Sequence, residues 1–239
     1  MYKLNIEKLI GWAPDLSIER GASIPKDFEI LSGQISFKNI SANQARRLSS
    51  LTKVSAELAL EVLHEKSVDH IVFSSRHGEL INSTQLLEMI ANNEVLSPTL
   101  FSQSVHNTAV GALSILKQTN VPTTSLGGGR NGFLYGLISS YLSLQENPTR
   151  KVLYLCADEK IPEIFSARLE EENIPFAVAM ILSLDFDQNG IGLEISNSTA
   201  VDASKDPVPQ ALRFLKWLFQ QNDSLHLANG PTDWILSKA

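Results

Sequence analysis

The run Gly127–Gly129 joins a β-prone stretch to an apolar helical pattern, and it constrains the fold more than any other segment. The preceding residues 121–126 carry no charge and are predicted to form a buried strand. Apolar side chains then recur at helical spacing as far as residue 142. Glycine permits the positive φ angles and the close backbone approach that a tight strand-to-helix turn requires. In an enzyme, such a turn can hold a nucleophile at a helix N-terminus, where the helix dipole favours an anion.

The turn itself contains no nucleophile. Arg130 and Asn131 follow the glycines, and no cysteine or base-flanked hydroxyl occurs among them. The segment also lacks the Gly-Lys-Ser/Thr ending of a P-loop and the spacing of a dinucleotide-binding loop. A structural turn is therefore favoured over a phosphate cradle, although amides at a helix N-terminus can bind an anion. Two interpretations of Arg130 are equally supported: its side chain is solvated, or it reaches a partner or an anion.

Composition indicates one ordinary globular domain, residues 1–239, because 43% of the residues are hydrophobic and 19% are charged. The net charge is −6, and no basic cluster exceeds a pair, which argues against a nucleic-acid interface. No stretch of 18 apolar residues predicts a membrane span, and the first residues do not resemble a signal peptide. The single cysteine, Cys156, excludes an intrachain disulfide and suits a reducing cytoplasm.

Apolar patterning predicts an α/β layered fold, because strands and helices alternate and some strands are apolar throughout. Residues 175–184 are predicted to form a strand buried on both faces, and residues 190–196 its antiparallel neighbour. Further strands are predicted at residues 2–10, 69–75 and 151–156, with an edge strand around 234–236. Helices are predicted from Ser41 to about His64, and at residues 83–92, 105–117, 131–144 and 209–221.

Cys156 is the obvious candidate nucleophile outside the glycine turn. It would need a histidine or a helix N-terminus beside it for activation. Asp158 and Glu159 follow it, and their carboxylates would raise the pKa of the thiol. We therefore favour a buried, inert cysteine, and we interpret Asp158–Glu159 as a capping or solvated pair rather than an acid/base couple.

Other candidate residues carry weaker signals. His106–Asn107 fits either a pocket wall or a satisfied buried pair, and the structural pair is favoured. No HxxxH or HExxH spacing occurs, so no metal site is expected. One apolar set fits either an acyl tunnel or core packing, and by itself it favours core packing; its members are Leu86, Met89, Ile90, Phe101 and Val105.

Several segments together resemble the N-terminal half of β-ketoacyl synthases. In order, they are residues 45–53 (ARRLSSLTK), 72–79 (VFSSRHGE) and 101–115 (FSQSVHNTAVGALSI). Residues 121–137 then fall where that family has its strand, catalytic cysteine and helix. The resemblance implies a thiolase-like layered α/β fold. It implies one half of the ketosynthase duplication, the N-terminal half, with a short C-terminal extension.

The chain lacks the catalytic residues that the family uses. The position of the family's nucleophilic cysteine falls near Gly129 or Arg130, and neither side chain can attack a thioester. The family's two catalytic histidines lie in a second structural half, and no matching motif follows residue 185. The resemblance therefore implies that the chain is not an enzyme by itself and needs no cofactor.

The segments SVHNTAVGALSI and GGGRNGFLYGLI are most similar to chain-length-factor-type proteins of bacterial aryl polyene and type II polyketide pathways. Such a protein forms a heterodimer with a full-length ketosynthase and meets acyl carrier protein transiently through the complex. The resemblance implies a cytoplasmic, non-catalytic subunit that shapes an acyl tunnel walled by Leu86, Met89, Ile90, Phe101 and Val105. It places the dimer interface at Thr123, Thr124, Ser125 and Leu126.

Two alternatives remain at this stage. The first is a small thioester-processing acyltransferase that uses Cys156, or His106 with a serine. The second is an anion- or coenzyme A-binding module that uses the turn Gly127, Gly128, Gly129 and Arg130.

Overall fold

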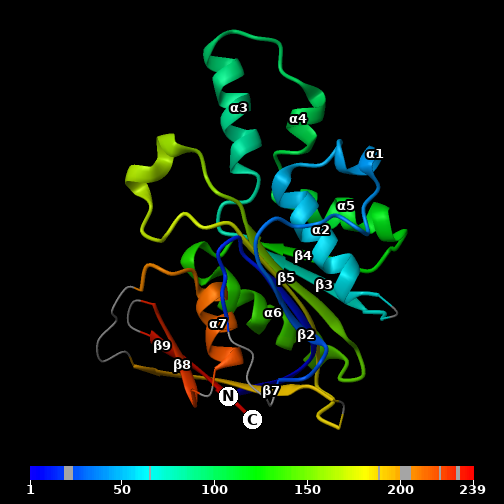
Figure 1. The fold of residues 1–239 in the computed structure, drawn as a ribbon, viewed down its shortest axis with the longest axis vertical. Helices are drawn as coiled ribbons and strands as arrows, with labels where there is room; N and C mark the ends of the chain where they lie inside the picture. Colours follow the sequence, from blue (N-terminus) through cyan, green and yellow to red (C-terminus); the bar gives the residue numbers. More distant parts are fainter. Residues whose placement is uncertain (19–23, 65, 188, 200–205, 221, 230–231) are drawn as a thin grey trace.

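The computed structural model describes residues 1–18, 24–64, 66–187, 189–199, 206–220, 222–229 and 232–239. In these residues, nine strands form one mixed sheet in the order β4-β3-β5-β6-β1-β7-β9-β8, with β2 beside β1 (Figure 1). The strands are β1 (Tyr2–Trp12), β2 (Phe28–Leu31), β3 (His70–Ser74), β4 (Thr123–Leu126), β5 (Val152–Asp158), β6 (Phe176–Ser183), β7 (Ile191–Thr199), β8 (Ser224–Asn229) and β9 (Thr232–Lys238).

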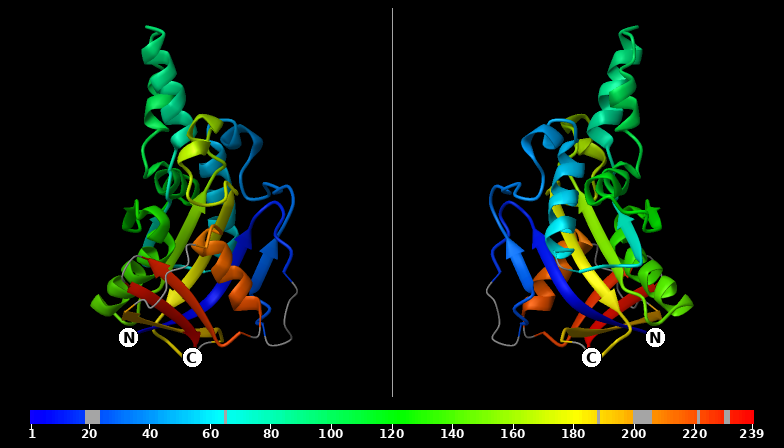
Figure 2. Two further views of the ribbon diagram at one scale, coloured as in Figure 1. Left: turned by 90° about the vertical axis from the view of Figure 1, so that its left-hand side faces the viewer. Right: turned by 90° about the vertical axis from the view of Figure 1, so that its right-hand side faces the viewer.

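Helices lie on both faces of the sheet. The helices are α1 (Ala42–Ala45), α2 (Ser50–Val62), α3 (Leu80–Ala91), α4 (Pro98–Ser102), α5 (Thr108–Lys117), α6 (Gly132–Glu146) and α7 (Gln210–Phe219), with 3-10 turns η1 (Gly129–Asn131) and η2 (Glu163–Arg168). One hydrophobic cluster joins α2 and α5 to the sheet, and another joins α6 and α7 to its other face. Helices α3 and α4 project away from these layers (Figure 2). Among the described helices, none combines the length and apolarity that crossing a membrane would need.

The direction of the strands sets the place of the glycine turn. Strand β3 pairs in parallel with β4 and with β5, whereas β6 runs antiparallel to β5 and β1. The carboxyl ends of β3, β4 and β5 therefore meet at one end of the sheet. In open α/β sheets, ligands and reacting groups gather at this end.

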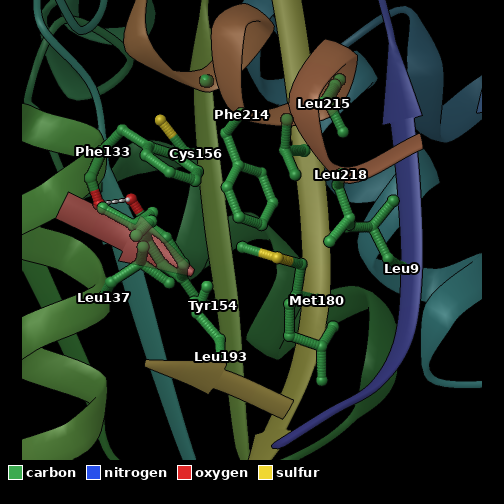
Figure 3. Close-up of a cluster of buried hydrophobic side chains, with 14 of the residues drawn as sticks. Leu9, Phe133, Leu137, Tyr154, Cys156, Met180, Leu193, Phe214, Leu215 and Leu218 are labelled. Atoms are coloured by element: carbon green, nitrogen blue, oxygen red, sulfur yellow. Dashed lines mark hydrogen bonds between the residues drawn. The ribbon is translucent and has the colours of Figure 1, made fainter. Parts of the chain in front are cut away.

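Aromatic side chains fill the core under α6 and α7, where Phe133, Tyr154 and Phe214 lie together (Figure 3). Tyr154 lies against Gly136, and a Cβ atom at that glycine would come within 2.3 Å of the tyrosine ring. The buried Tyr154 hydroxyl donates to the Phe133 carbonyl oxygen at 2.7 Å. The missing side chain at Gly136 is thus what lets α6 pack closely on β5.

The C-terminal segment completes this core. Strand β7 pairs with the first half of β1, and β9 and β8 follow it at that end of the sheet. Leu225, Leu227 and Leu236 from this ribbon join the cluster that contains Phe214 and Leu218 of α7. The C-terminal extension expected from the sequence is therefore an integral part of the core.

The predicted helix from Ser41 to His64 is wrong in one respect, because it is two helices. Ser41 caps α1, as expected, in a capping box with Gln44. The chain then leaves the helical path before Ser49, whose extended backbone begins α2. The Ser49 hydroxyl accepts from the Thr52 amide at 3.0 Å. A second N-cap residue inside the apolar stripe therefore divides the pattern.

Strand pairing differs from the sequence prediction at three places. Strand β7 does not pair with β6, because β1 lies between them and pairs with both. Strand β4 is not a buried strand: it is the first strand of the sheet, Thr123 is exposed, and the other three residues are half-buried. Strand β9 is not an edge, because β8, which the patterning did not predict, pairs along it. Pairing partners are set by tertiary packing, so local periodicity could not identify them.

Candidate functional site

The glycine turn leads from β4 directly into α6. Gly129 has a φ of +56°, which glycine adopts without strain. A Cβ atom at Gly128 would lie 2.7 Å from the Cα atom of Gly132, so no larger residue fits there. The turn has the tight geometry that its sequence predicts, at the sheet end where β3 and β5 also finish.

Arg130 is engaged within the chain. Its Nε atom donates to Glu171 Oε1 at 3.0 Å, and its Nη2 atom donates to the Asp206 carbonyl oxygen at 2.9 Å. Arg76 forms an ion pair with the same Glu171, whose side chain is only 8% exposed. Glu170 Oε2 also lies 3.4 Å from Arg130 Nη1, so two carboxylates face the two arginines, and Arg130 is neither simply solvated nor uncompensated. This compensation removes the main support for an anion- or coenzyme A-binding turn.

The start of α6 also has internal partners. Asn131 is buried, and its Oδ1 atom accepts from Gln210 Nε2 of α7 at 3.1 Å. The Oε1 atom of the same glutamine accepts from the Leu134 amide at 3.4 Å. A side chain of α7 thus takes up an amide that an anionic ligand would otherwise contact.

Asp158 closes the loop that follows β3. Its carboxylate accepts hydrogen bonds from the Ser75 hydroxyl at 2.7 Å and from the Arg76 and His77 amides at 3.0 and 2.9 Å. Burial raises the pKa of Asp158, and these three hydrogen bonds oppose the rise. Asp158 thus closes a loop, whereas Glu159 has the helix-terminal role expected of the pair, because the Leu51 and Ile81 amides in the first turns of α2 and α3 hydrogen-bond it. The expectation of a solvated pair is wrong, because both side chains are buried.

Cys156 is an inert core residue. Its side chain lies among buried residues that include Phe133 and Phe214 (Figure 3). Burial, followed by the charge of Asp158, raises the pKa of the thiol to about 12. A thiolate is the nucleophilic form, so this environment suppresses the chemistry that an acyltransferase would need.

The pair His106–Asn107 is divided between two environments. The His106 ring lies against Gly78 and Gly127, and its Nε2 atom hydrogen-bonds the Ser75 carbonyl oxygen at 3.1 Å. Asn107 is exposed and begins α5. His106 therefore holds the glycine turn against the β3 loop, whereas the expected burial of Asn107 is not observed.

The five residues expected to wall a tunnel lie on or directly after α3 and α4, which we call the α3–α4 arm (residues 80–102). Leu86 is buried and Met89 is half-buried, whereas Ile90, Phe101 and Val105 are 57%, 62% and 43% exposed. Other apolar side chains near them are exposed as well: Leu87, Val95 and Leu96. Helices α3 and α4, which carry four of the five residues, form a projecting element (Figures 1 and 2), and three of the five expose much of their surface to solvent.

Two hollows open elsewhere, and Trp12 contributes to the lining of both. The first, of about 210 Å³, is lined by Trp12, Leu31 and Glu57 among others. The second, of about 240 Å³, is lined by Val54, Glu159 and other residues. Neither includes an expected tunnel residue. In the part of the chain that the structure describes, no group of three or more His, Cys, Asp or Glu residues could hold a metal ion.

Some residues of this region were not singled out from the sequence. The buried Glu79 and the half-buried Glu171, whose side chain is 8% exposed, organise the loops around the turn, and Gln210 reaches the turn from α7. Glu79 had a weak signal, because it directly follows Gly78 at the end of a predicted strand. Glu171 and Gln210 lie 41 and 80 residues beyond Arg130, and nothing local marks them.

Comparison with solved structures supports a ketosynthase-type fold. One chain of the structure described as a ketosynthase (ApeO) in complex with its chain length factor (ApeC), from Xenorhabdus doucetiae, is 28% identical with a TM-score of 0.83. The match covers 99% of this chain and 100% of that chain. No curated protein matches the chain.

Two further structures share the fold alone. The ishigamide ketosynthase/chain length factor matches with a TM-score of 0.57 at 14% identity, over 70% of this chain and 54% of that chain. A β-ketoacyl synthase from Burkholderia phymatum matches with a TM-score of 0.54 at 9% identity, over 83% and 65%. The chain thus spans about half to two thirds of these two proteins.

The family model of the β-ketoacyl synthase N-terminal domain matches residues 22–237, which is most of the chain. The mixed α/β sheet and the strand-turn-helix unit at its edge agree with the thiolase-like fold expected from the sequence. The chain therefore belongs to the β-ketoacyl synthase N-terminal domain family.

Proposed function

We propose that this chain is a non-catalytic, chain-length-factor-like subunit that pairs with an active ketosynthase and shapes its acyl channel. One observation carries the proposal: the turn that would hold a ketosynthase nucleophile is fully formed, but Gly129 and Arg130 occupy it. Full-length similarity to a chain of a ketosynthase–chain length factor complex supports the same role.

Chemistry supports the non-catalytic part of the proposal. Condensation through a covalent acyl-enzyme requires an activated nucleophile. Cys156 is the one cysteine of the chain, and its buried thiol has a pKa of about 12. The nucleophile and its histidine partners would therefore come from the ketosynthase subunit.

The free edge of β4 supports a pairing surface. The Ile71 and Ser75 amides of the β3 segment donate to the Pro122 and Leu126 carbonyl oxygens. In a parallel ladder, alternate residues direct both backbone groups to the same neighbour, so the N–H and C=O groups of Thr123 and Ser125 face away from β3. An open row of such groups is a template for another strand. We assign Thr123, Thr124, Ser125 and Leu126 to the contact with the ketosynthase.

The α3–α4 arm supports the channel-shaping part. Its exposed apolar side chains, with Phe101 and Ile90 at 62% and 57%, would lose this exposure against a partner. Together with Leu86, Met89 and Val105, they would wall the channel and limit its depth. Overfilling a packed interior costs about 1–3 kcal/mol, which is enough to reject one further two-carbon unit.

The substrates implied are carrier-bound acyl chains of the aryl polyene or type II polyketide kind. The acyl carrier protein would dock transiently on the complex rather than bind this chain tightly. The single free cysteine suits the reducing cytoplasm of a bacterial cell.

Enlarging and reducing Phe101 tests the channel-shaping role. In a complex with the ketosynthase, we expect Phe101→Trp to shorten the longest product and Phe101→Ala to lengthen it, because side-chain volume sets the depth. Mass spectrometry of the products measures the change, and Ser102→Ala, at the adjacent exposed residue, is the control. Identical product lengths from both Phe101 variants in an active complex would rule out this role.

A further inference from the structure

The α3–α4 arm is joined to the body by few apolar contacts. Leu86 is the one large apolar side chain of α3 that is buried, and α4 has no buried residue. The other buried residues of α3, Asn82 and Thr84, are polar. Polar contacts at its base must therefore hold the arm in place.

Glu79 is the centre of these contacts. It directly precedes α3 and is only 3% exposed. Its Oε1 atom accepts from the Ser49 hydroxyl at 2.6 Å and from the Thr52 hydroxyl at 2.7 Å, both at the start of α2. Its Oε2 atom accepts from Asn82 Nδ2 at 3.2 Å. Hydrogen bonds to a buried carboxylate are stronger than those between neutral groups.

The contacts continue from Glu79 to α4. Asn82 Nδ2 also donates to the Gln103 carbonyl oxygen at 2.9 Å, at the C-terminal end of α4. The Gln103 side-chain amide in turn donates to the carbonyl oxygen of Arg47, which lies ahead of α2. We call Glu79, Ser49, Thr52, Asn82 and Gln103 the arm hub, because they connect α2, α3 and α4.

A second carboxyl group supports the hub from the sheet. Glu159, which follows β5, is hydrogen-bonded by the backbone amides of Leu51 and Ile81, in the first turns of α2 and α3. Burial and the neighbouring charge of Glu79 raise the pKa of Glu159 to about 7. The orientation of α3 relative to α2 thus depends on two buried carboxyl groups instead of apolar packing.

We propose that Glu79 is a positioning residue that fixes the α3–α4 arm on α2 and thereby sets the depth of the acyl channel. The channel part rests on the proposed function, whereas the fixing of the arm rests on the hub alone. The arm projects from the body (Figure 2), and Ile90 lies near the end of α3 that is far from Glu79, so a small rotation at the base displaces Ile90. Loss of the hub contacts would therefore broaden the range of acyl chain lengths that the channel accepts, although every residue of the channel wall would still be present.

The test compares Glu79→Ala and Glu79→Gln with Glu88→Gln, an exposed carboxyl on the same helix. Each variant is made in the full chain and co-expressed with the ketosynthase. Hydrogen exchange of the α3 backbone amides should be about ten-fold faster in Glu79→Ala, because the hub bonds that resist local opening are lost. Glu79→Gln, which keeps a carbonyl acceptor, should show a smaller effect, and Glu88→Gln should match wild type.

Product lengths form the second readout. We expect Glu79→Ala to broaden the distribution of chain lengths, while the Glu88→Gln complex keeps that of wild type. Unchanged α3 exchange in Glu79→Ala overturns the proposal altogether. Faster exchange with unchanged products overturns its channel part. A wild-type chain that forms no complex overturns the proposed function, and exchange in that chain still decides whether Glu79 fixes the arm.

Discussion

At the residue scale, the side chains around the glycine turn satisfy one another. Arg130 and Arg76 share Glu171, and Asn131 is bound by Gln210. A catalytic turn keeps donors and charge available for a substrate or a transition state. In this turn, Arg130 instead pairs with Glu171, which follows η2, and Asn131 pairs with Gln210 of α7. This is the arrangement expected of a structural turn.

Glu159 gives a prediction about pH. Its folded-state pKa of about 7 lies above the ordinary value of 4.5, so the folded chain binds this proton more tightly than the unfolded chain. The stabilisation is complete below about pH 4.5 and is lost as the pH rises through 7. Glu159→Gln imitates the protonated form. The difference in unfolding free energy between this variant and wild type should therefore shift by about 2 kcal/mol in favour of the variant as the pH rises from 5 to 8.

Urea unfolding at several pH values measures this difference. Glu163→Gln is the matched control, because Glu163 is exposed and lies four residues further along the chain. The unfolding free energy of Glu163→Gln should change with pH in the same way as that of wild type. If the unfolding free energy of Glu159→Gln also changes in this way, the carboxyl group does not titrate as its environment indicates.

At the element scale, periodicity predicted most helices and strands, because each buries one face or both. Strand β6 was recognised from its uninterrupted apolar run, and α6 from its helical spacing. The gap between α1 and α2 was missed because the apolar stripe continues across it. Strand β8 was missed because Ser224–Asn229 carries only two strongly apolar side chains, Leu225 and Leu227.

The site could be predicted only where its residues are local in sequence. The glycine turn was evident because Gly127–Asn131 are consecutive. The contacts of Arg130 with Glu171 and Asp206 were not, because 41 and 76 residues separate the partners. Likewise, the arm hub joins Ser49 and Glu79 across 30 residues, and no repeat or spacing marks such a pair.

Strand β4 gives a prediction about assembly. Ser125→Pro removes an N–H group that faces away from β3, so it should weaken pairing with the ketosynthase while leaving the β3–β4 ladder intact. Ser125→Ala keeps the amide and serves as the control. Co-purification of the tagged chain with the ketosynthase should fall for the proline variant alone. Equal recovery of both complexes would show that β4 is not the pairing edge.

At the scale of the whole molecule, the C-terminal third completes the fold. Phe214 and Leu218 of α7 and Leu236 of β9 bury themselves with residues of α6 and β5. This core forms without a second ketosynthase half, and the chain spans only 54% and 65% of the two larger proteins that share its fold. The proposed contacts with a partner lie at the free edge of β4 and on the α3–α4 arm, outside this core.

The most direct test of the account is co-expression of this chain with a full-length ketosynthase, followed by size-exclusion chromatography with mass determination and an elongation assay. We predict a one-to-one complex that elongates carrier-bound acyl chains only when both subunits are present. The same complex should keep its activity when Cys156 is replaced by alanine. A chain that elutes alone and leaves the elongation by the ketosynthase unchanged would contradict the account.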